Sequence, residues 1–360
     1  MDRKVKIGII GSGGIAGAHV RAYKQMPDVE ILGVADVIPG KAEEFVHRHE
    51  LTDTQAFDSH LELLELDLDG VSVCTPNIAH HQTSVDALQA GKHVLVEKPL
   101  AITLEQGLEM VRAGKKADKM LTVGFQPRYD PNMQAVKKIV QSELGNVYYI
   151  QTGGGRRRGM PGGTFVNKSL AGAGAMADIG CYSLDLALNA LDYPKPLSVS
   201  AFTSNHFGTN PAHHPEAEKF EVEDFGVALV RLEGGKVLNF KVSWAMHADS
   251  LGPTLFLGTD AGLKLTPAGS GPWSGVWDGG IGSITMFHDV QGHHTESTIP
   301  VQQHNYNIFY EKVRDFVVSI KEDKPAPIPG EEILINQAII DGILRSSELG
   351  KEVDIAIPEL

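Results

Sequence analysis

The sequence predicts an α/β protein with two domains: a doubly wound parallel sheet, followed by an α+β domain with a mostly antiparallel sheet. Three observations predict it. Short apolar strand-like runs alternate with helical segments from residue 4 to about 125, a glycine-rich turn joins the first run to a helix, and the rhythm changes after Gln126. We therefore expect domains over residues 1–125 and 126–360.

The first strand, residues 5–10, leads through the glycine-rich turn into a helix over about residues 13–25. The turn reads G-x-G-x-x-A: Gly11 allows a tight turn, Gly13 a close approach to phosphate, and Ala16 close packing on the sheet. Backbone N–H groups and the helix dipole bind a pyrophosphate at such a position, although glycines also mark ordinary turns. The segment predicts a dinucleotide site made by Gly11, Ser12, Gly13, Gly14, Ile15 and Ala16.

The second strand, residues 29–35, ends at Asp36. A carboxylate there accepts hydrogen bonds from both adenosine ribose hydroxyls and repels a 2′-phosphate, which favours NAD over NADP. Two alternatives remain: Asp36 begins a turn before Pro39, or nearby Lys41 helps to bind a phosphate. The order of strand, glycine turn, helix, strand and acid favours the cofactor site.

The remaining elements follow from short apolar runs and the turns between them. In the first domain we expect strands at 71–74, 93–96 and 121–124 and helices at 79–90 and 104–117. In the second we expect strands at 147–152, 197–203, 225–232, 237–244 and 254–257, with a hairpin turn at 233–236. Helices are expected at 132–142, 305–320 and 331–349, the last after a proline-rich segment.

Composition excludes several classes of protein. The chain has 42% hydrophobic and 21% charged residues and a net charge of −13, which argues against a nucleic-acid partner. It has no apolar stretch of about 20 residues and no apolar segment of a signal peptide, so we expect no membrane association and a cytoplasmic location. Cys74 and Cys181 fit a reducing compartment. The histidine pairs at 213–214 and 293–294 lack a carboxylate-backed ligand spacing, so we expect no metal site.

Two polar motifs follow predicted strands, at the sheet edge where ligands bind. Thr75, Pro76 and Asn77 form a stiff turn whose backbone can line the cofactor. In Glu97-Lys98-Pro99, burial favours the neutral amine of a lysine and a carboxylate neighbour opposes this, so Lys98 can hold or relay a proton. Its alternative role is a surface salt bridge. A cis bond before the proline would aim Lys98 into a cleft.

A third group of polar residues lies in the second domain. If a helix begins near Asp178, then Asp178, Tyr182 and Asp185 share one face at i, i+4 and i+7. Each has an ordinary alternative, since an aspartate often caps a helix and a tyrosine often packs in a core. Trp273 and Trp277, in a glycine-rich loop, can stack on a sugar or be buried.

Together the glycine turn, Thr75-Pro76-Asn77 with His80, Glu97-Lys98-Pro99, and the segment from Asp178 to Asp185 resemble the glucose-fructose oxidoreductase, inositol dehydrogenase and MocA family of NAD(P)-dependent oxidoreductases. The resemblance covers essentially the whole chain. It implies a Rossmann domain and an open-faced sheet domain that assembles as a homodimer or homotetramer. It also implies that Lys98 and Asp178 flank the substrate carbon that faces the nicotinamide. Many members have histidine where this chain has Tyr182, which leaves the proton acceptor open.

These expectations define the site. The catalytic residues are Lys98, Asp178 and Tyr182, of which Lys98 and Tyr182 share the hydroxyl proton while Asp178 and Asp185 hold Lys98 and neighbouring hydroxyls. Beyond the glycine turn and Asp36, the cofactor residues are Thr75, Pro76, Asn77, His80, Glu97, Lys98 and Gln126. The substrate residues are Lys98, Arg128, Arg156, Asp178, Tyr182 and Asp185.

The function expected is a dehydrogenase that transfers hydride between a secondary hydroxyl of a sugar, polyol or glycoside and NAD. One alternative is an NAD-dependent glycoside hydrolase or epimerase that oxidises its substrate transiently and retains the cofactor. Another is a non-catalytic NAD(H)-sensing regulator, which the presence of Lys98, Asp178 and Tyr182 disfavours.

Overall fold

A computed structural model describes residues 3–267, 281–302 and 307–360. The chain divides into two compact units. The first unit comprises residues 1–126, 307–334 and 358–360, and the second unit comprises residues 127–306 and 335–357. The first unit thus contains residues 1–125, expected as the first domain, together with two segments from the carboxyl-terminal part of the chain.

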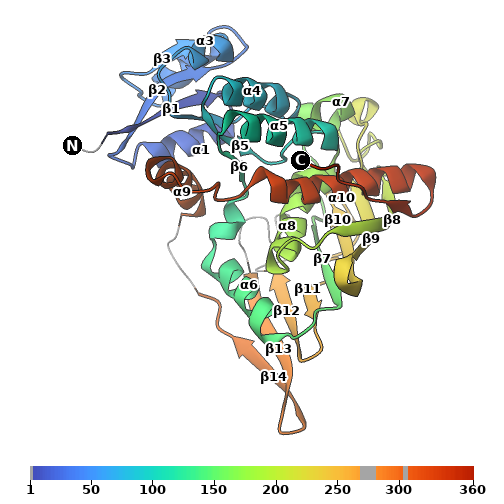
Figure 1. Cartoon of the computed structure of the whole chain (residues 1–360). Helices are drawn as coiled ribbons and strands as arrows, with labels where there is room; N and C mark the ends of the chain where they lie inside the picture. Colours follow the sequence, from blue (N-terminus) through green and yellow to red (C-terminus); the bar gives the residue numbers. More distant parts are fainter. Residues whose placement is uncertain (1–2, 268–280, 303–306) are drawn as a thin grey trace. The chain divides into compact units, whose positions relative to one another are not determined.

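The described residues of the first unit form a six-stranded sheet in the order β3-β2-β1-β4-β5-β6, and every pairing is parallel (Figure 1). The order confirms the predicted doubly wound sheet. Only β3, three residues long, was not expected. The strands are β1 (Val5–Ile10), β2 (Val29–Ala35), β3 (Gln55–Phe57), β4 (Gly70–Val73), β5 (His93–Glu97) and β6 (Leu121–Gly124).

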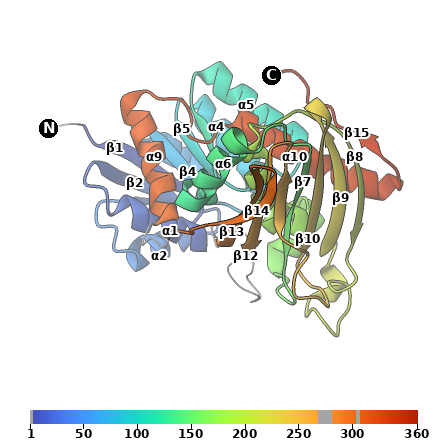
Figure 2. The ribbon, with the colours of Figure 1, turned by 90° about the horizontal axis from the view of Figure 1, so that it is seen from below.

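Six helices are assigned wholly to the first unit: α1 (Gly14–Tyr23), α2 (Lys41–Arg48), α3 (His60–Leu64), α4 (Asn77–Gln89), α5 (Leu104–Ala117) and α9 (Ile308–Glu322). Helix α9 packs beside α1 (Figure 2), and Arg314 and Lys321 of α9 form ion pairs with Asp28 at 2.9 and 2.8 Å. Residues 305 and 306, expected to begin this helix, lie outside the described residues.

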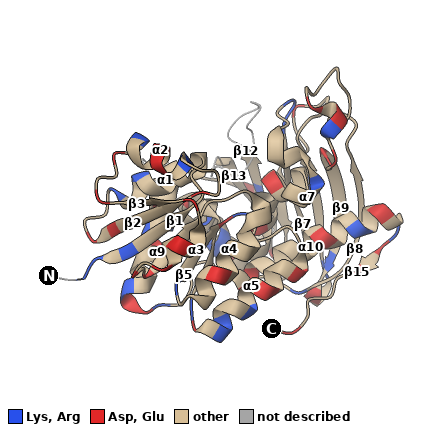
Figure 3. Ribbon diagram, turned by 90° about the horizontal axis from the view of Figure 1, so that it is seen from above, with Lys and Arg blue, Asp and Glu red and all other residues tan. Residues whose placement is uncertain are grey.

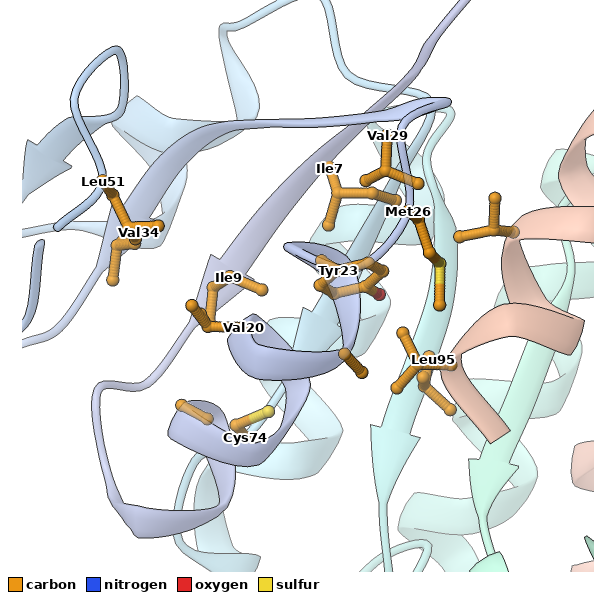
Figure 4. Close-up of a cluster of buried hydrophobic side chains, with 14 of the residues drawn as sticks. Ile7, Ile9, Val20, Tyr23, Met26, Val29, Val34, Leu51, Cys74 and Leu95 are labelled. Atoms are coloured by element: carbon orange, nitrogen blue, oxygen red, sulfur yellow. The ribbon is translucent and has the colours of Figure 1, made fainter. Parts of the chain in front are cut away.

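The core of the first unit fixes α1 against the sheet. Ile7 and Ile9 of β1 pack with Val20 and Tyr23 of α1, as Figure 4 shows, and Phe316 of α9 belongs to the same cluster. Fully burying such side chains stabilises the fold by about 1.5–3 kcal/mol each. Because this packing sets the position of α1, it also sets the position of the glycine turn from which α1 begins.

The described residues of the second unit form a nine-stranded sheet in the order β14-β13-β12-β11-β7-β10-β9-β8-β15. Strands β7 and β10 are parallel and the other pairs antiparallel, as predicted in outline. The strands are β7 (Tyr149–Gly155), β8 (Pro196–Ser204), β9 (Phe225–Leu232), β10 (Lys236–Ser243), β11 (Thr254–Leu257), β12 (Ala261–Pro267), β13 (Ile281–Val290), β14 (His293–Ile299) and β15 (Val353–Asp354).

Several parts of this sheet were not expected: strands β12, β13, β14 and β15, and the end of β7. Strand β14 consists mainly of exposed polar residues, so it lacks the apolar alternation that marks a half-buried strand. Strand β7 continues through Gly153 to Gly155, although three glycines favour a loop. At Gly153 (φ 146°) a Cβ atom would lie 1.8 Å from the carbonyl oxygen of Lys241, so only glycine allows the two backbones to approach there.

The helices of the second unit are α6 (Pro131–Glu143), α7 (Lys168–Ala171), α8 (Cys181–Ala190) and the main part of α10 (Gly330–Leu349). One face of the sheet is buried through residues such as Val230 and Phe240, whereas the other exposes Phe202 and Leu229. Helices α5 and α10 carry both acidic and basic residues (Figure 3). Within the described ranges, every helix is too short or too polar to cross a bilayer.

Candidate active site

The turn between β1 and α1 has the geometry of an anion site. Gly11 has a φ of +93°, and a Cβ atom there would lie 2.7 Å from the carbonyl oxygen of Cys74, so glycine is required. Gly13 precedes the first residue of α1, which has no side-chain cap and no acidic residue in its first turn. Apart from the neighbouring residues of the same turn and helix, no described atom lies within 4 Å of a Cβ built on Gly13 or Gly14. The turn therefore has the space and the backbone donors that the pyrophosphate of NAD requires.

Asp36 lies directly beside this turn. Its Oδ2 accepts hydrogen bonds from the backbone N of Ser12 at 3.0 Å and from Ser12 Oγ at 2.6 Å, and its Oδ1 accepts from Ile38 N at 3.0 Å. Partial burial raises the pKa of Asp36, but these hydrogen bonds outweigh burial and hold the pKa below its ordinary value. A negative charge at the end of β2 fits a ribose diol and repels a 2′-phosphate.

The segment after β4 carries a buried polar atom without a protein partner among the described residues. Thr75 Oγ1 is buried and has no hydrogen-bond partner among the residues that the structure describes. Asn77 is the first residue of α4, and Pro76 precedes it. A buried hydroxyl without a partner costs stability unless a ligand or water completes it, which agrees with a cofactor-lining role for this segment.

His80, expected to contact the cofactor, lies between two backbone carbonyl groups. Its Nδ1 lies 2.7 Å from the carbonyl oxygen of Pro99, and its Nε2 lies 3.0 Å from that of Thr75. Burial lowers the pKa of His80 more than these carbonyls raise it, so the ring is neutral and donates to one of them. The imidazole therefore lies between the segments that follow β4 and β5 and donates one hydrogen bond to them.

Glu97 is likewise turned into the first unit. Its side chain is 7% exposed, and Oε1 contacts His19 Nε2 at 2.7 Å and forms an ion pair with Lys312. Burial by itself would raise the pKa of Glu97. The charge of Lys312 and the hydrogen bond of His19 lower the pKa by more than burial raises it, so the carboxylate is ionised. Lys98 follows, half-buried, and the Lys98–Pro99 peptide bond is cis. Gln126, at the end of the first unit, is buried.

In the second unit, Asp178 lies in a π-helical turn, Met176–Gly180, that runs into α8. Glu223 accepts hydrogen bonds on Oε1 from the backbone N of Gly174 at 2.8 Å and of Met176 at 3.0 Å, and so caps this turn. Trp244 Nε1 donates to Asp178 Oδ2 at 2.9 Å. The helix thus begins before Asp178, and the spacing of an α-helix does not apply across the wider turn.

Arg128 and Asp185, both expected to bind substrate, bind each other. Arg128 donates from Nε to Asp185 Oδ2 at 2.9 Å and from Nη2 to Oδ1 at 2.8 Å, and Tyr193 OH contacts both side chains. The paired side chains are only 12% and 5% exposed. This bidentate pair neutralises Asp185 and attaches α8 to the segment before α6.

Tyr182 and Arg156 are both mostly buried within the second unit. Tyr182, with Arg128 and Asp185, lines a pocket of about 20 Å³, which is room for roughly one water molecule. Arg156 Nη1 donates to the carbonyl oxygen of Gly159 at 2.8 Å. Burial lowers the pKa of Arg156, and the charge of Asp178 opposes that shift. The charge of Asp178 therefore acts on the guanidinium of Arg156.

Neither Glu223 nor the role of Trp244 could be predicted from local sequence, because both act through contacts with residues distant in the chain. Trp273 and Trp277 lie outside the described residues. The ring of His213 packs against Phe207, with the ring centroids 5.1 Å apart. In the parts of the chain that the structure describes, no group of three or more His, Cys, Asp or Glu side chains could hold a metal ion.

Comparison with known proteins agrees with this geometry. Residues 5–125 match the model of an oxidoreductase family with an NAD-binding Rossmann fold, GFO/IDH/MocA, and residues 133–264 match the model of the GFO/IDH/MocA C-terminal domain. The chain is 32% identical over 273 residues to D-glucoside 3-dehydrogenase of Escherichia coli, covering 73% of this chain and 78% of that protein.

Two further similarities differ in extent. Glucose-6-phosphate 3-dehydrogenase of Bacillus subtilis is 32% identical over 186 residues, which cover 50% of this chain and 52% of that protein. A levoglucosan dehydrogenase in complex with NADH superimposes with a TM-score of 0.82 over 99% of this chain and 100% of that one, at 21% identity, which supports the fold. From the two matched domain models and the glycine turn with its acidic neighbour, we conclude that the chain belongs to the GFO/IDH/MocA family of NAD-binding oxidoreductases.

Proposed function

We propose that this oxidoreductase oxidises a secondary hydroxyl group of a sugar, polyol or glycoside, with NAD as the hydride acceptor. The observation that carries the cofactor assignment is the uncapped α1 N-terminus beside the ionised Asp36. The substrate class is supported by the relatives, which include a D-glucoside dehydrogenase and an inositol 2-dehydrogenase of Lactiplantibacillus plantarum that is 36% identical over 138 residues.

NAD, when bound, accepts the hydride that leaves the substrate carbon. The chain must then take up the hydroxyl proton, and we propose that Lys98 and Tyr182 share it. A free tyrosine, whose pKa is near 10, is a weak base at neutral pH unless a nearby cation stabilises the phenolate, and we propose Lys98 as that cation. Asp178, oriented by the indole of Trp244, would hold Lys98 and a substrate hydroxyl by hydrogen bonds. The pairing of Asp185 with Arg128 argues for a positioning role of Asp185 instead.

The experiment is a screen of NAD⁺ reduction against polyols, aldoses, glycosides and sugar acids, with Lys98→Met as the test variant. Loss of an acid–base group lowers turnover by roughly 100-fold or more. Lys98→Arg is the matched control, because arginine keeps the charge but does not release a proton. Full turnover of Lys98→Met with intact NAD binding would contradict the assignment.

The same screen separates the other functions. If the purified protein carries tightly bound nucleotide and converts substrate without net formation of NADH, it is a hydrolase or epimerase. Nucleotide binding without turnover of any carbohydrate would identify a regulator. Tyr182→Phe then locates the proton acceptor: if Lys98 suffices, this variant keeps most of its turnover, and if the phenol is required, turnover falls with that of Lys98→Met.

We further propose that the first unit binds the cofactor and that the second binds substrate and forms a homodimer or homotetramer through its sheet. The support is the uncovered sheet face, where Phe202 is 56% and Leu229 is 43% exposed on neighbouring strands. Large apolar side chains gathered on one face are typical of an interface. Light scattering of Phe202→Glu/Leu229→Glu tests this: we expect dissociation, and an unchanged mass would exclude this face.

We also propose a cytoplasmic location. Cys74 and Cys181 are both buried as free thiols, which agrees with a reducing compartment. Fractionation of cells that produce the native protein would test the location, and its recovery from an extracellular or membrane fraction would refute it.

A further inference from the structure

A continuous chain of buried polar side chains includes Glu97, the residue before Lys98. Glu97 Oε1 contacts His19 Nε2 at 2.7 Å and the ammonium of Lys312. His19 Nδ1 lies 3.0 Å from Ser72 Oγ, which lies 2.7 Å from Tyr23 OH. None of the five side chains belongs to a residue more than 5% exposed. We call His19, Tyr23, Ser72, Glu97 and Lys312 the Glu97 network.

The network joins the elements that form the cofactor side of the proposed site. His19 and Tyr23 belong to α1, which begins at the glycine turn, and Glu97 is the last residue of β5, immediately before Lys98. Lys312 enters from α9, 215 residues further along the chain than Glu97. On β6, a Cβ atom at Gly124 would lie 2.8 Å from Glu97 Oε1, so the carboxylate is also confined from that side.

The protons in the network have one consistent arrangement. Burial and the charge of Lys312 lower the pKa of His19, so its ring is neutral. A neutral ring that donates from Nε2 to the Glu97 carboxylate must accept at Nδ1, from the Ser72 hydroxyl. Burial raises the pKa of Tyr23, whose OH therefore keeps its proton and donates to Ser72 Oγ. Every polar atom along this path has a partner of the correct kind, and Lys312 balances the charge of Glu97.

Stability alone does not explain the buried ion pair of Glu97 and Lys312. Desolvation of two buried charges offsets most of their attraction, and apolar residues of similar volume often stabilise a core equally well. What the pair does provide is a fixed geometry for the backbone of residue 97. We propose that Lys312 is a positioning residue: through Glu97 and His19 it holds Lys98 and helix α1 in one rigid arrangement. This inference rests on the role proposed above for Lys98.

The test compares Lys312→Met with Arg314→Met, which removes a cation from the same helix. Arg314 pairs with Asp28, before β2, and lies outside the Glu97 network. A misplacement of about 1 Å at a reacting group can cost on the order of 100-fold in rate, so we expect Lys312→Met to lower kcat between tenfold and 100-fold. Arg314→Met should change kcat by less than about twofold, and KM for the sugar should move little in either variant. Equal kcat values for the two variants would overturn the inference.

A second variant removes the effect of an unpaired buried charge. The double variant Glu97→Gln/Lys312→Met removes both charges of the pair, so no buried carboxylate is left without its cation. Its melting temperature should therefore recover toward that of wild type even if Lys312→Met folds poorly. The inference predicts that kcat of the double variant stays low while stability returns. Recovery of both to wild-type values would show that the network only maintains the fold, and would overturn the inference.

Calorimetric titration with NAD⁺, without any sugar, separates this inference from the proposed function. Because the network also holds α1, Lys312→Met should weaken NAD⁺ binding at least threefold relative to Arg314→Met. An equal dissociation constant in both variants would contradict the coupling to α1. If wild type binds NAD⁺ but oxidises no carbohydrate, the proposed function fails, and this titration still decides whether the network positions the cofactor helix.

Discussion

The two units contain candidate carboxylates of two kinds. In the first unit Glu97 is paired with the buried cation Lys312, whereas Asp36 is held by neutral donors from Ser12 and Ile38. In the second unit Asp185 is paired with Arg128, whereas Asp178 accepts a hydrogen bond from the indole of Trp244. A carboxylate neutralised by a buried cation anchors the fold, while one oriented by neutral donors retains a charge that a ligand can use. The two units differ in how far the paired cation lies along the chain from its carboxylate: 215 residues for Glu97 and 57 residues for Asp185.

The largest effect should come from breaking the anchor in the second unit. Arg128→Met leaves the Asp185 carboxylate buried without its cation, which typically costs about 3–5 kcal/mol in the free energy of unfolding. Denaturant titration measures this cost. The matched double variant Arg128→Met/Asp185→Asn should recover most of it. If the single variant is as stable as wild type, Asp185 is not an anchor and its expected role in binding substrate regains support.

The next largest effect should come from replacing Asp36, the carboxylate of the first unit that keeps its charge. Asp36→Ala removes charged hydrogen bonds to ribose, each worth about 1.5–3 kcal/mol, so NAD affinity should fall roughly tenfold or more. Affinity for NADP should fall less or rise, because the repulsion of the 2′-phosphate is lost. Titration of both nucleotides gives the ratio. Unchanged NAD affinity in Asp36→Ala would refute the ribose assignment.

Trp244→Phe tests the charge-retaining carboxylate of the second unit. It keeps an aromatic ring but removes the hydrogen bond to Asp178, which is worth about 1.5–3 kcal/mol to a charged acceptor in a favourable geometry. We expect kcat to fall about tenfold, with little change in NAD affinity. Steady-state kinetics and NAD titration measured on one preparation distinguish this result from general damage. If NAD affinity falls while kcat does not change, the indole of Trp244 does not orient Asp178 for catalysis.

The smallest effect should come from Asp28 of the first unit, which forms ion pairs with Arg314 and Lys321. Hydrogen bonds from Lys321 and Arg314 lower the pKa of Asp28 to about 2 from the ordinary 3.8, although burial raises it. Because the folded-state pKa is lower, the ion pairs stabilise the protein above about pH 4 and are lost as pH falls toward 2. The free energy of unfolding of wild type should therefore exceed that of Asp28→Asn at pH 6, and the difference should shrink by pH 3. A difference that does not change with pH would exclude this ionic contribution.

Much of the site in the first unit could be predicted because its signals are local. Gly11, Gly13 and Asp36 lie within one strand–helix–strand unit, so the parallel sheet places them once the strands are recognised. Glu97 was predicted beside the cofactor for the same reason. The burial of its side chain beside Lys312 could not be predicted, because this cation comes from a helix far along the chain.

The second unit shows the limit of local signals more strongly. The motif around Asp178 was visible, but the π-helical turn depends on Glu223, and the orientation of Asp178 depends on Trp244. Arg128 and Asp185 were each recognised as polar residues suited to a site, and their mutual pairing was not.

By itself, the sequence determined the fold class, the glycine turn, the acidic end of β2 and the motifs of the family. These are properties of backbone conformation and of spacing within a few dozen residues. Only the tertiary structure decided which carboxylates are neutralised, because Asp185 and Glu97 meet their cations 57 and 215 residues away. The charge that a buried group keeps depends on which distant side chains the packed core brings within hydrogen-bond distance.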